Sequence, residues 1–111
     1  IPLKPLGTKM SDALVEMSSK GFGCVGIVDD HGQLAGIVTD GDLRRHMRPD
    51  LMTARVDEVM TTNPKTIGAK LLAGEALEIL NSSKITALIV TDDKKPVGIL
   101  HLHDLLRAGV A

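Results

Sequence analysis

Two polar residues, Thr39 and Asp42, stand where an apolar run gives way to a predicted helix, and they could bind a phosphorylated ligand. Residues 36–42 read Gly-Ile-Val-Thr-Asp-Gly-Asp. A helix N-terminus offers free N–H groups and a partial positive charge, which favour phosphate. Thr39 can donate a hydrogen bond to a phosphate oxygen, and the Asp42 carboxylate can accept both hydroxyls of a ribose. The alternative is that Thr39 and Asp42 only cap the helix.

A second stretch, residues 98–104, repeats this pattern with one change. It reads Gly-Ile-Leu-His-Leu-His-Asp, so Asp104 is kept while His101 takes the place of the threonine. A neutral histidine can still donate one hydrogen bond to a phosphate, and a charged one would help more. The second site is therefore expected to be altered in specificity, or empty.

Other reactive side chains give weaker signals. His101, His103 and Asp104 raise the idea of a metal-dependent hydrolase, but a tight site needs three or four supported ligands and no further His or Cys is clustered there. Cys24 sits in an apolar run, which predicts a buried, inert thiol. We expect no metal site and no catalytic residue in this chain.

An internal repeat must position the two stretches. Residues 27–43 align without gaps with residues 89–105, so that Ile27 matches Ile89. Ile27 and Ile89 are 62 positions apart, whereas upstream of them Asp12 and its match Glu75 are 63 positions apart. This difference predicts one extra residue in the first copy, near positions 21–23. The repeat gives copies at 1–48 and 58–111, joined by a linker at 49–57.

Each copy has the same expected elements. Apolar residues at 10, 13, 14 and 17 recur at helical spacing, and Gly21 and Gly23 end that helix. A strand at 24–28, a turn at 29–32, a strand at 34–38 and a helix carrying Leu43 and Met47 follow. Copy two repeats them as a helix at 71–82, strands near 86–91 and 96–100 and a helix at 102–108, and it adds a lead-in strand at 65–67. This predicts an α+β fold of two pseudo-twofold repeats, with two small sheets packed together and flanked by helices.

Composition excludes several classes of partner. The 111 residues carry a net charge of −1 and one aromatic residue, Phe22, which argues against nucleic-acid platforms and anionic membranes. The basic cluster Arg44-Arg45-His46-Arg48 is flanked by acidic residues and is interpreted as a solvated helix face. No run is long enough to span a membrane, and a single Cys fits a reducing cytoplasm. The start at Ile1 is expected to reflect a piece of a longer protein.

The repeat resembles a known family. Residues 59–67, Val-Met-Thr-Thr-Asn-Pro-Lys-Thr-Ile, followed by 84–90, Lys-Ile-Thr-Ala-Leu-Ile-Val, and by 96–105 are similar to a cystathionine-β-synthase (CBS) domain. Residues 36–43 match the nucleotide-contact motif of the same unit. The resemblance implies a CBS pair, or Bateman module, of two β-α-β-β-α repeats that covers essentially the whole chain.

A narrower resemblance concerns both motif ends. Residues 39–45 and 101–110 are similar to the C-terminal end of bacterial arabinose-5-phosphate isomerases, which join a sugar-isomerase (SIS) domain to a CBS pair and make the precursor of Kdo, a lipopolysaccharide or capsule sugar. This implies a regulatory nucleotide- or nucleotide-sugar-binding and dimerisation module, not itself an isomerase. CMP-Kdo is the expected ligand because it is the activated end product of the implied pathway, and an adenine nucleotide is the general alternative. A purely structural dimerisation module without ligand stays open.

The resemblance also implies site residues and partners. Thr39 and Asp42 would take phosphate and ribose in one cleft; Asp104, with His101 in place of the usual Thr, would serve the other. Thr66 and the turn Ile85-Thr86-Ala87 sit where such domains line the base pocket. The expected partners are a second CBS pair in a homodimer and the SIS domain of the parent, which is expected to be a tetramer.

Overall fold

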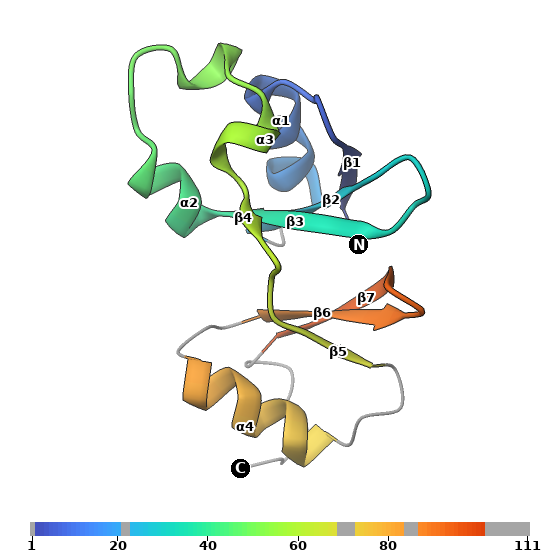
Figure 1. Cartoon of the computed structure of the whole chain (residues 1–111). Helices are drawn as coiled ribbons and strands as arrows, with labels where there is room; N and C mark the ends of the chain where they lie inside the picture. Colours follow the sequence, from blue (N-terminus) through green and yellow to red (C-terminus); the bar gives the residue numbers. More distant parts are fainter. Residues whose placement is uncertain (1, 21–22, 69–72, 84–86, 102–111) are drawn as a thin grey trace. The chain divides into compact units, whose positions relative to one another are not determined.

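The computed structural model describes residues 2–20, 23–68, 73–83 and 87–101. They divide between two compact units, Ile1–Pro64 and Lys65–Ala111. Figure 1 shows the elements of both units in chain order. Each unit contains one small sheet with helices, so the α+β class is confirmed.

Unit 1 is a four-stranded mixed sheet with helices. Its elements are β1 (Leu3–Pro5), α1 (Met10–Lys20), β2 (Cys24–Val28), β3 (Leu34–Thr39), α2 (Asp40–Arg45), the 3-10 turn η1 (Leu51–Thr53), α3 (Val56–Val59) and β4 (Thr61–Thr62). The strands lie in the order β1-β2-β3-β4. β1 runs parallel to β2, whereas β3 is antiparallel to both β2 and β4.

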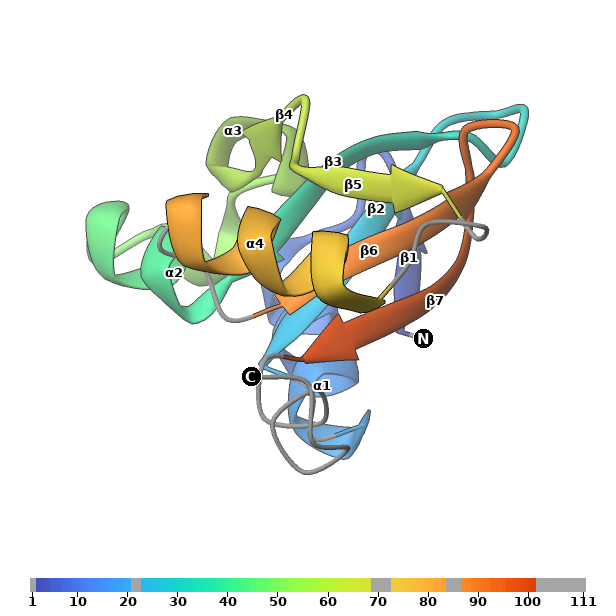
Figure 2. The same ribbon diagram turned by 90° about the horizontal axis from the view of Figure 1, so that it is seen from below.

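Unit 2 is a smaller version of the same arrangement. Its described elements are β5 (Thr66–Gly68), α4 (Ala73–Ser83), β6 (Ala87–Asp92) and β7 (Lys95–His101). β5 is parallel to β6, and β6 is antiparallel to β7. Figure 2, a view turned by 90° from Figure 1, shows α4 lying along this sheet. The helix predicted at 102–108 lies outside the described residues.

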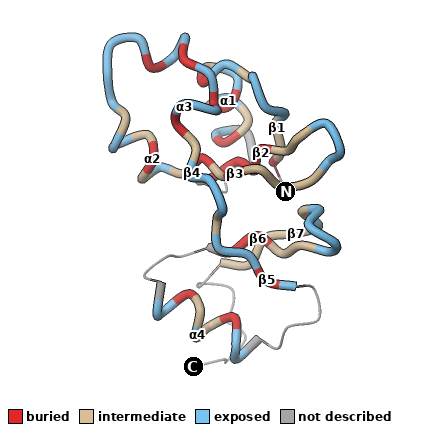
Figure 3. Tube along the Cα trace, viewed as in Figure 1, coloured by how far each residue is buried: buried red, intermediate tan, exposed pale blue. Residues whose placement is uncertain are grey.

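The two first helices form for the reason that the sequence predicts. Met10, Ala13 and Met17 are buried on one face of α1, three and four residues apart, and this spacing is that of one helical face. Ala76 and Leu80 occupy the matching positions of α4 and are both fully buried. Figure 3 shows buried stretches, in red, along both α1 and α4.

Strand pairing places the extra residue of copy one in the hairpin, not near positions 21–23. Ile27 pairs with Gly36 and Val90 pairs with Gly98, the matching glycine of the repeat, so Ile27 corresponds to Val90, 63 residues later. Both hairpins shift register directly after this residue. The predicted match of Ile27 with Ile89 is wrong because neighbouring registers of an aliphatic strand look alike in sequence, whereas backbone pairing distinguishes them.

The longer hairpin of copy one is closed by Asp29. The backbone N–H groups of His31 and Gln33 donate to its Oδ1 at 2.9 and 3.0 Å, and Gly32 takes φ +76°. The hairpin of copy two turns through Asp93 and Lys94, both also at positive φ. The predicted turn at 29–32 is confirmed.

Two further expectations are corrected, and the predicted linker is seen in more detail. The lead-in strand is not a special feature of copy two, because β1 plays the same part in copy one. α2 ends at Arg45, so Met47 lies beyond it and is 70% exposed. Residues 49–57, the predicted linker between the copies, hold η1 and the start of α3 in unit 1. The side chains from this stretch and the rest of α3 that enter the core of unit 1 are Leu51, Ala54, Val56 and Val59.

Hydrogen bonds explain why this segment packs in place. The Met10 N–H donates to the Ala54 carbonyl and the Val56 N–H donates to the Thr8 carbonyl, both at 2.8 Å. Asp57 accepts the Gly7 N–H at 2.7 Å. The segment therefore closes the turn between β1 and α1. The repeat bounds 1–48 and 58–111 stay a prediction about sequence similarity.

Candidate functional site

Thr39 and Asp42 meet at the junction of β3 and α2, as the sequence predicts. Thr39 is the N-cap of α2, and its Oγ1 accepts the Asp42 N–H at 3.2 Å. The Asp42 Oδ2 accepts the Thr39 N–H at 2.9 Å in return. This reciprocal pair is a capping box, and it satisfies two backbone donors that the helix end would otherwise leave open.

The Asp42 carboxylate has more partners than a cap requires. Its Oδ2 also accepts the Thr39 hydroxyl at 3.1 Å. Its Oδ1 accepts Arg45 Nη2 at 2.6 Å and the hydroxyl of Thr61, from β4, at 2.7 Å. A carboxylate offers about four acceptor positions, and four donors occupy them here. Asp42 is only 2% exposed.

These donors set the charge state of Asp42. Burial by itself raises the pKa of a carboxyl group. The hydrogen bonds from Thr61, Arg45 and Thr39 outweigh burial, and the pKa of Asp42 is lowered below its ordinary value. Asp42 is therefore a charged, fully hydrogen-bonded group at neutral pH.

The sequence motif indicates Thr39 and Asp42, but it does not identify Arg45 and Thr61 as hydrogen-bond partners of Asp42. The spacing of Asp42 and Arg45, three residues apart on one helix, is a usable signal for an ion pair. Thr61 lies 19 residues from Asp42, and no local pattern connects the two. As arranged, the four residues cap α2 and hold β4. A ligand hydroxyl must displace one of these donors to reach Asp42.

The basic cluster at residues 44–48 begins in the last turn of α2, and two of its three arginines pair with acidic neighbours. Arg45 pairs with Asp42, and Arg48 approaches Asp50 at 2.9 Å and Glu58 at 3.5 Å. Both arginine side chains remain partly exposed. This agrees with a solvated, charge-balanced face.

In unit 2, the predicted base-pocket residue Ala87 and the predicted second-site residue His101 lie opposite each other on paired strands. Ala87 and His101 are paired across β6 and β7, as Cys24 and Thr39 are paired across β2 and β3. Thr66 begins β5 and is exposed. Ile85, Thr86 and Asp104 lie outside the described residues.

The catalytic alternatives gain no support within the described part of the chain. Cys24 is 3% exposed, and burial, with a smaller contribution from the charge of Asp40, raises the pKa of its thiol to about 11. Such a thiol stays protonated and unreactive at neutral pH. Among the described residues no group of three His, Cys, Asp or Glu side chains gathers to hold a metal; His103 and Asp104 lie outside them.

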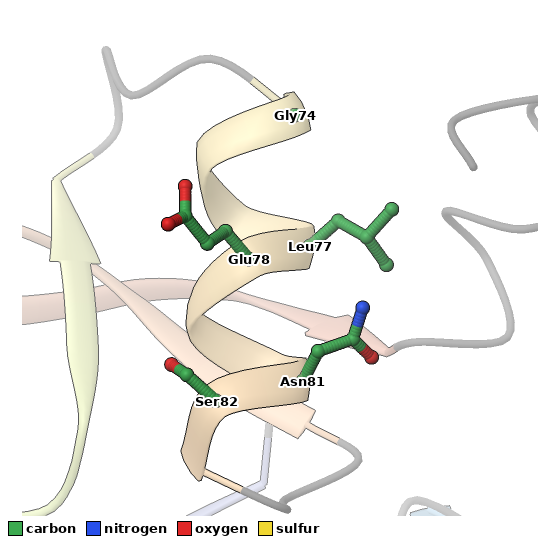
Figure 4. A pocket seen from close by; sticks show the side chains of 5 residues that line it. All are labelled: Gly74, Leu77, Glu78, Asn81 and Ser82. Atoms are coloured by element: carbon green, nitrogen blue, oxygen red, sulfur yellow. The ribbon is translucent and has the colours of Figure 1, made fainter.

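A groove of about 480 Å³ runs along α4 and was not predicted. It is lined by Gly74, Leu77, Glu78, Asn81 and Ser82, all on one side of the helix (Figure 4). None of the predicted ligand residues that the structure describes is in its lining.

No described helix combines the length and apolar character that a membrane span needs.

Comparison with known proteins identifies a repeated family domain, in agreement with the two similar units of the fold. The CBS domain family model matches residues 5–49 and 56–111. Arabinose 5-phosphate isomerase KdsD of Pseudomonas aeruginosa is 51% identical over 113 residues, which cover 99% of this chain and 35% of the isomerase. The chain therefore spans about a third of the length of this relative.

Solved structures show the same fold. A CBS-domain-containing protein of Agrobacterium tumefaciens superposes with a TM-score of 0.87 at 19% identity, over 98% of this chain and 89% of that one. CBSX2, solved in complex with AMP, superposes with a TM-score of 0.84 at 26% identity, over 99% and 87%. Because one family model matches both halves of the sequence, the chain belongs to the CBS domain family.

Proposed function

We propose that this chain is the regulatory nucleotide- or nucleotide-sugar-binding and self-association module of an arabinose-5-phosphate isomerase. The observation that carries the proposal is the 51% identity to KdsD over 99% of the chain. The parent enzyme would interconvert ribulose 5-phosphate and arabinose 5-phosphate for Kdo synthesis in the cytoplasm. Its SIS domain would be the partner that the module regulates.

The ligand site of the proposal is the β3–α2 junction. Thr39 would donate to a phosphate, and Asp42 would accept the hydroxyls of a ribose. The AMP complex of CBSX2 supports an adenine nucleotide as one candidate. CMP-Kdo is the other candidate, as the activated end product of the proposed pathway. Thr66, Ala87 and His101, with Ile85, Thr86 and Asp104, would form the second cleft.

A thermal-melt panel tests the ligand part of the proposal. The full chain is melted with AMP, ATP, CMP and CMP-Kdo, each over a range of concentrations. A ligand at 100 times its dissociation constant should raise the unfolding free energy by about 2.7 kcal/mol. The variant Asp42→Asn, compared with its own ligand-free melt, should lose this increase. No shift with any of the four ligands would contradict nucleotide binding.

A second candidate function is a purely structural dimerisation module. The observation that favours it is the full occupancy of Asp42 by Thr39, Arg45 and Thr61, which a cap and a strand contact explain without a ligand. Sedimentation of the full chain tests it. A stable dimer together with unchanged melts in all four ligands supports the structural module, whereas a monomer at all concentrations contradicts it.

A further inference from the structure

The two oxygens of Asp42 are held in different ways. Both donors to Oδ2 belong to Thr39, the neighbouring N-cap residue, and one of them is its backbone N–H. The donors to Oδ1 are the side chains of Arg45 and Thr61. A side-chain donor can swing away without disturbing the backbone, so Oδ1 is the oxygen that can be vacated.

Arg45 is the Oδ1 donor best placed to leave. Its side chain is 64% exposed, while that of Asp42 is 2% exposed. Water solvates the guanidinium once it is released, and salt screens the pair, so both lower the cost of separating Arg45 from Asp42. A ligand hydroxyl that takes the vacated acceptor position gives Asp42 a donor again, so the buried carboxylate is not left short of a partner in the complex.

Arg45 also covers the start of α2. A Cβ placed on Gly41 would lie 3.2 Å from Arg45 Nη1, 3.6 Å from Nη2 and 3.5 Å from Thr39 Oγ1. The guanidinium thus folds back from the last residue of α2 over the first turn, and the missing side chain at Gly41 leaves room for it. It lies beside both residues that a nucleotide would need.

We propose that Arg45 is an internal competitor for the ligand site. Its guanidinium occupies the acceptor position on Asp42 Oδ1 that a ribose hydroxyl requires, so a nucleoside binds only when Arg45 has moved away. The inference rests on the proposed nucleotide function and adds regulation to that same site. It makes the affinity of the site depend on an ion pair within the protein.

The test uses uncharged nucleosides, because they separate competition from attraction between Arg45 and a phosphate. Binding of adenosine and of cytidine to the full chain is measured by titration calorimetry, with AMP alongside. Arg45→Gln should bind whichever nucleoside the wild type binds about two- to fivefold more tightly, within the range that loss of a partly exposed ion pair allows. Arg44→Gln is the matched control, because it removes the same charge from the adjacent exposed residue and should leave the affinity unchanged.

Salt provides a second readout that a merely structural Arg45 would not move. Screening weakens the Asp42–Arg45 pair, so wild-type affinity for the uncharged nucleoside should rise with ionic strength, and this rise should vanish in Arg45→Gln. If the wild type binds and Arg45→Gln binds the nucleoside equally or less tightly, the competition is overturned and the proposed function stands. If neither protein binds either nucleoside or AMP, the competition is overturned, and the nucleotide function then fails only if CMP and CMP-Kdo also leave the melt unchanged.

Discussion

At the scale of single residues, one hydrogen bond joins β4 to α2: the Thr61 hydroxyl donates to Asp42 Oδ1. Thr61→Val keeps the shape of the side chain and removes the donor, which leaves a buried carboxylate short of one partner. The variant should lose about 1.5–3 kcal/mol of unfolding free energy, as expected for a hydrogen bond to a charged group. Urea unfolding measures this loss.

Two controls distinguish this bond from a general effect of the substitution. Thr62→Val makes the same change at the next residue of β4, which is exposed like Thr61, and should stay within about 0.5 kcal/mol of wild type. Thr61→Ser keeps the hydroxyl and should recover most of the loss. Equal destabilisation by Thr61→Val and Thr62→Val would show that the bond to Asp42 contributes nothing particular.

Acid should remove the same contribution. The pKa of Asp42 in the folded chain lies below its ordinary value, since donors including Thr61 outweigh burial. A lowered folded pKa stabilises the protein above the unfolded pKa of about 3.9, and the stabilisation is lost as pH falls through the folded value. The difference in unfolding free energy between wild type and Thr61→Val should therefore shrink as pH falls from 7 to 3. A difference that stays constant over this range would contradict a charged Asp42 as the acceptor.

At the element scale, the segment from η1 to α3 is part of the core of unit 1. Leu51 is 4% exposed, whereas Met52, the next residue of the same turn, is 37% exposed. Leu51→Ala should cost about 2–5 kcal/mol of unfolding free energy through lost burial and a cavity. Met52→Ala should cost less than about 0.5 kcal/mol. Similar small losses for both variants in urea unfolding would restore the interpretation of this segment as a linker.

Close packing between elements also explains why residue 36 of β3 is a glycine. A Cβ on Gly36 of β3 would lie 2.7 Å from Met60 Sδ and 2.9 Å from the Thr61 carbonyl oxygen. Gly98, the matching residue of β7, has its nearest neighbour at 3.9 Å. The two glycines look alike in the repeat, but among the described residues only a Cβ on Gly36 would meet other atoms closer than 3 Å.

At the scale of the whole molecule, the compact units and the sequence repeat divide the chain at different places. Unit 1 extends to Pro64, whereas the predicted first copy ends at residue 48. A chain of residues 1–64 should fold and give a dispersed amide NMR spectrum. A chain of residues 1–48 should not, because it lacks the core residues Leu51, Val56 and Val59. Equally dispersed spectra from both chains would contradict this boundary.

Much of the fold follows from local patterns. The helical spacing of Met10, Ala13 and Met17, the glycine at the 29–32 turn and the N-cap Thr39 each specify a local conformation with few alternatives. The strand register did not follow, because Ile27 resembles both Ile89 and Val90 in a run of aliphatic residues. Backbone pairing across each hairpin distinguishes the two, because Ile27 pairs with Gly36 and Val90 pairs with Gly98.

The candidate site divides in the same way. By itself, the sequence determined the paired CBS repeats, the strand-to-helix junction and the presence of Thr39 and Asp42 there. The repeats are visible as two similar segments, and the junction is specified by residues that are close together in the chain. Only the tertiary structure decided that Thr61 and the folded-back Arg45 complete the hydrogen bonds of Asp42, and that the expected linker belongs to the core. The physical reason is that chain segments distant in sequence meet only when burial brings them together, and a buried carboxylate takes every donor within reach.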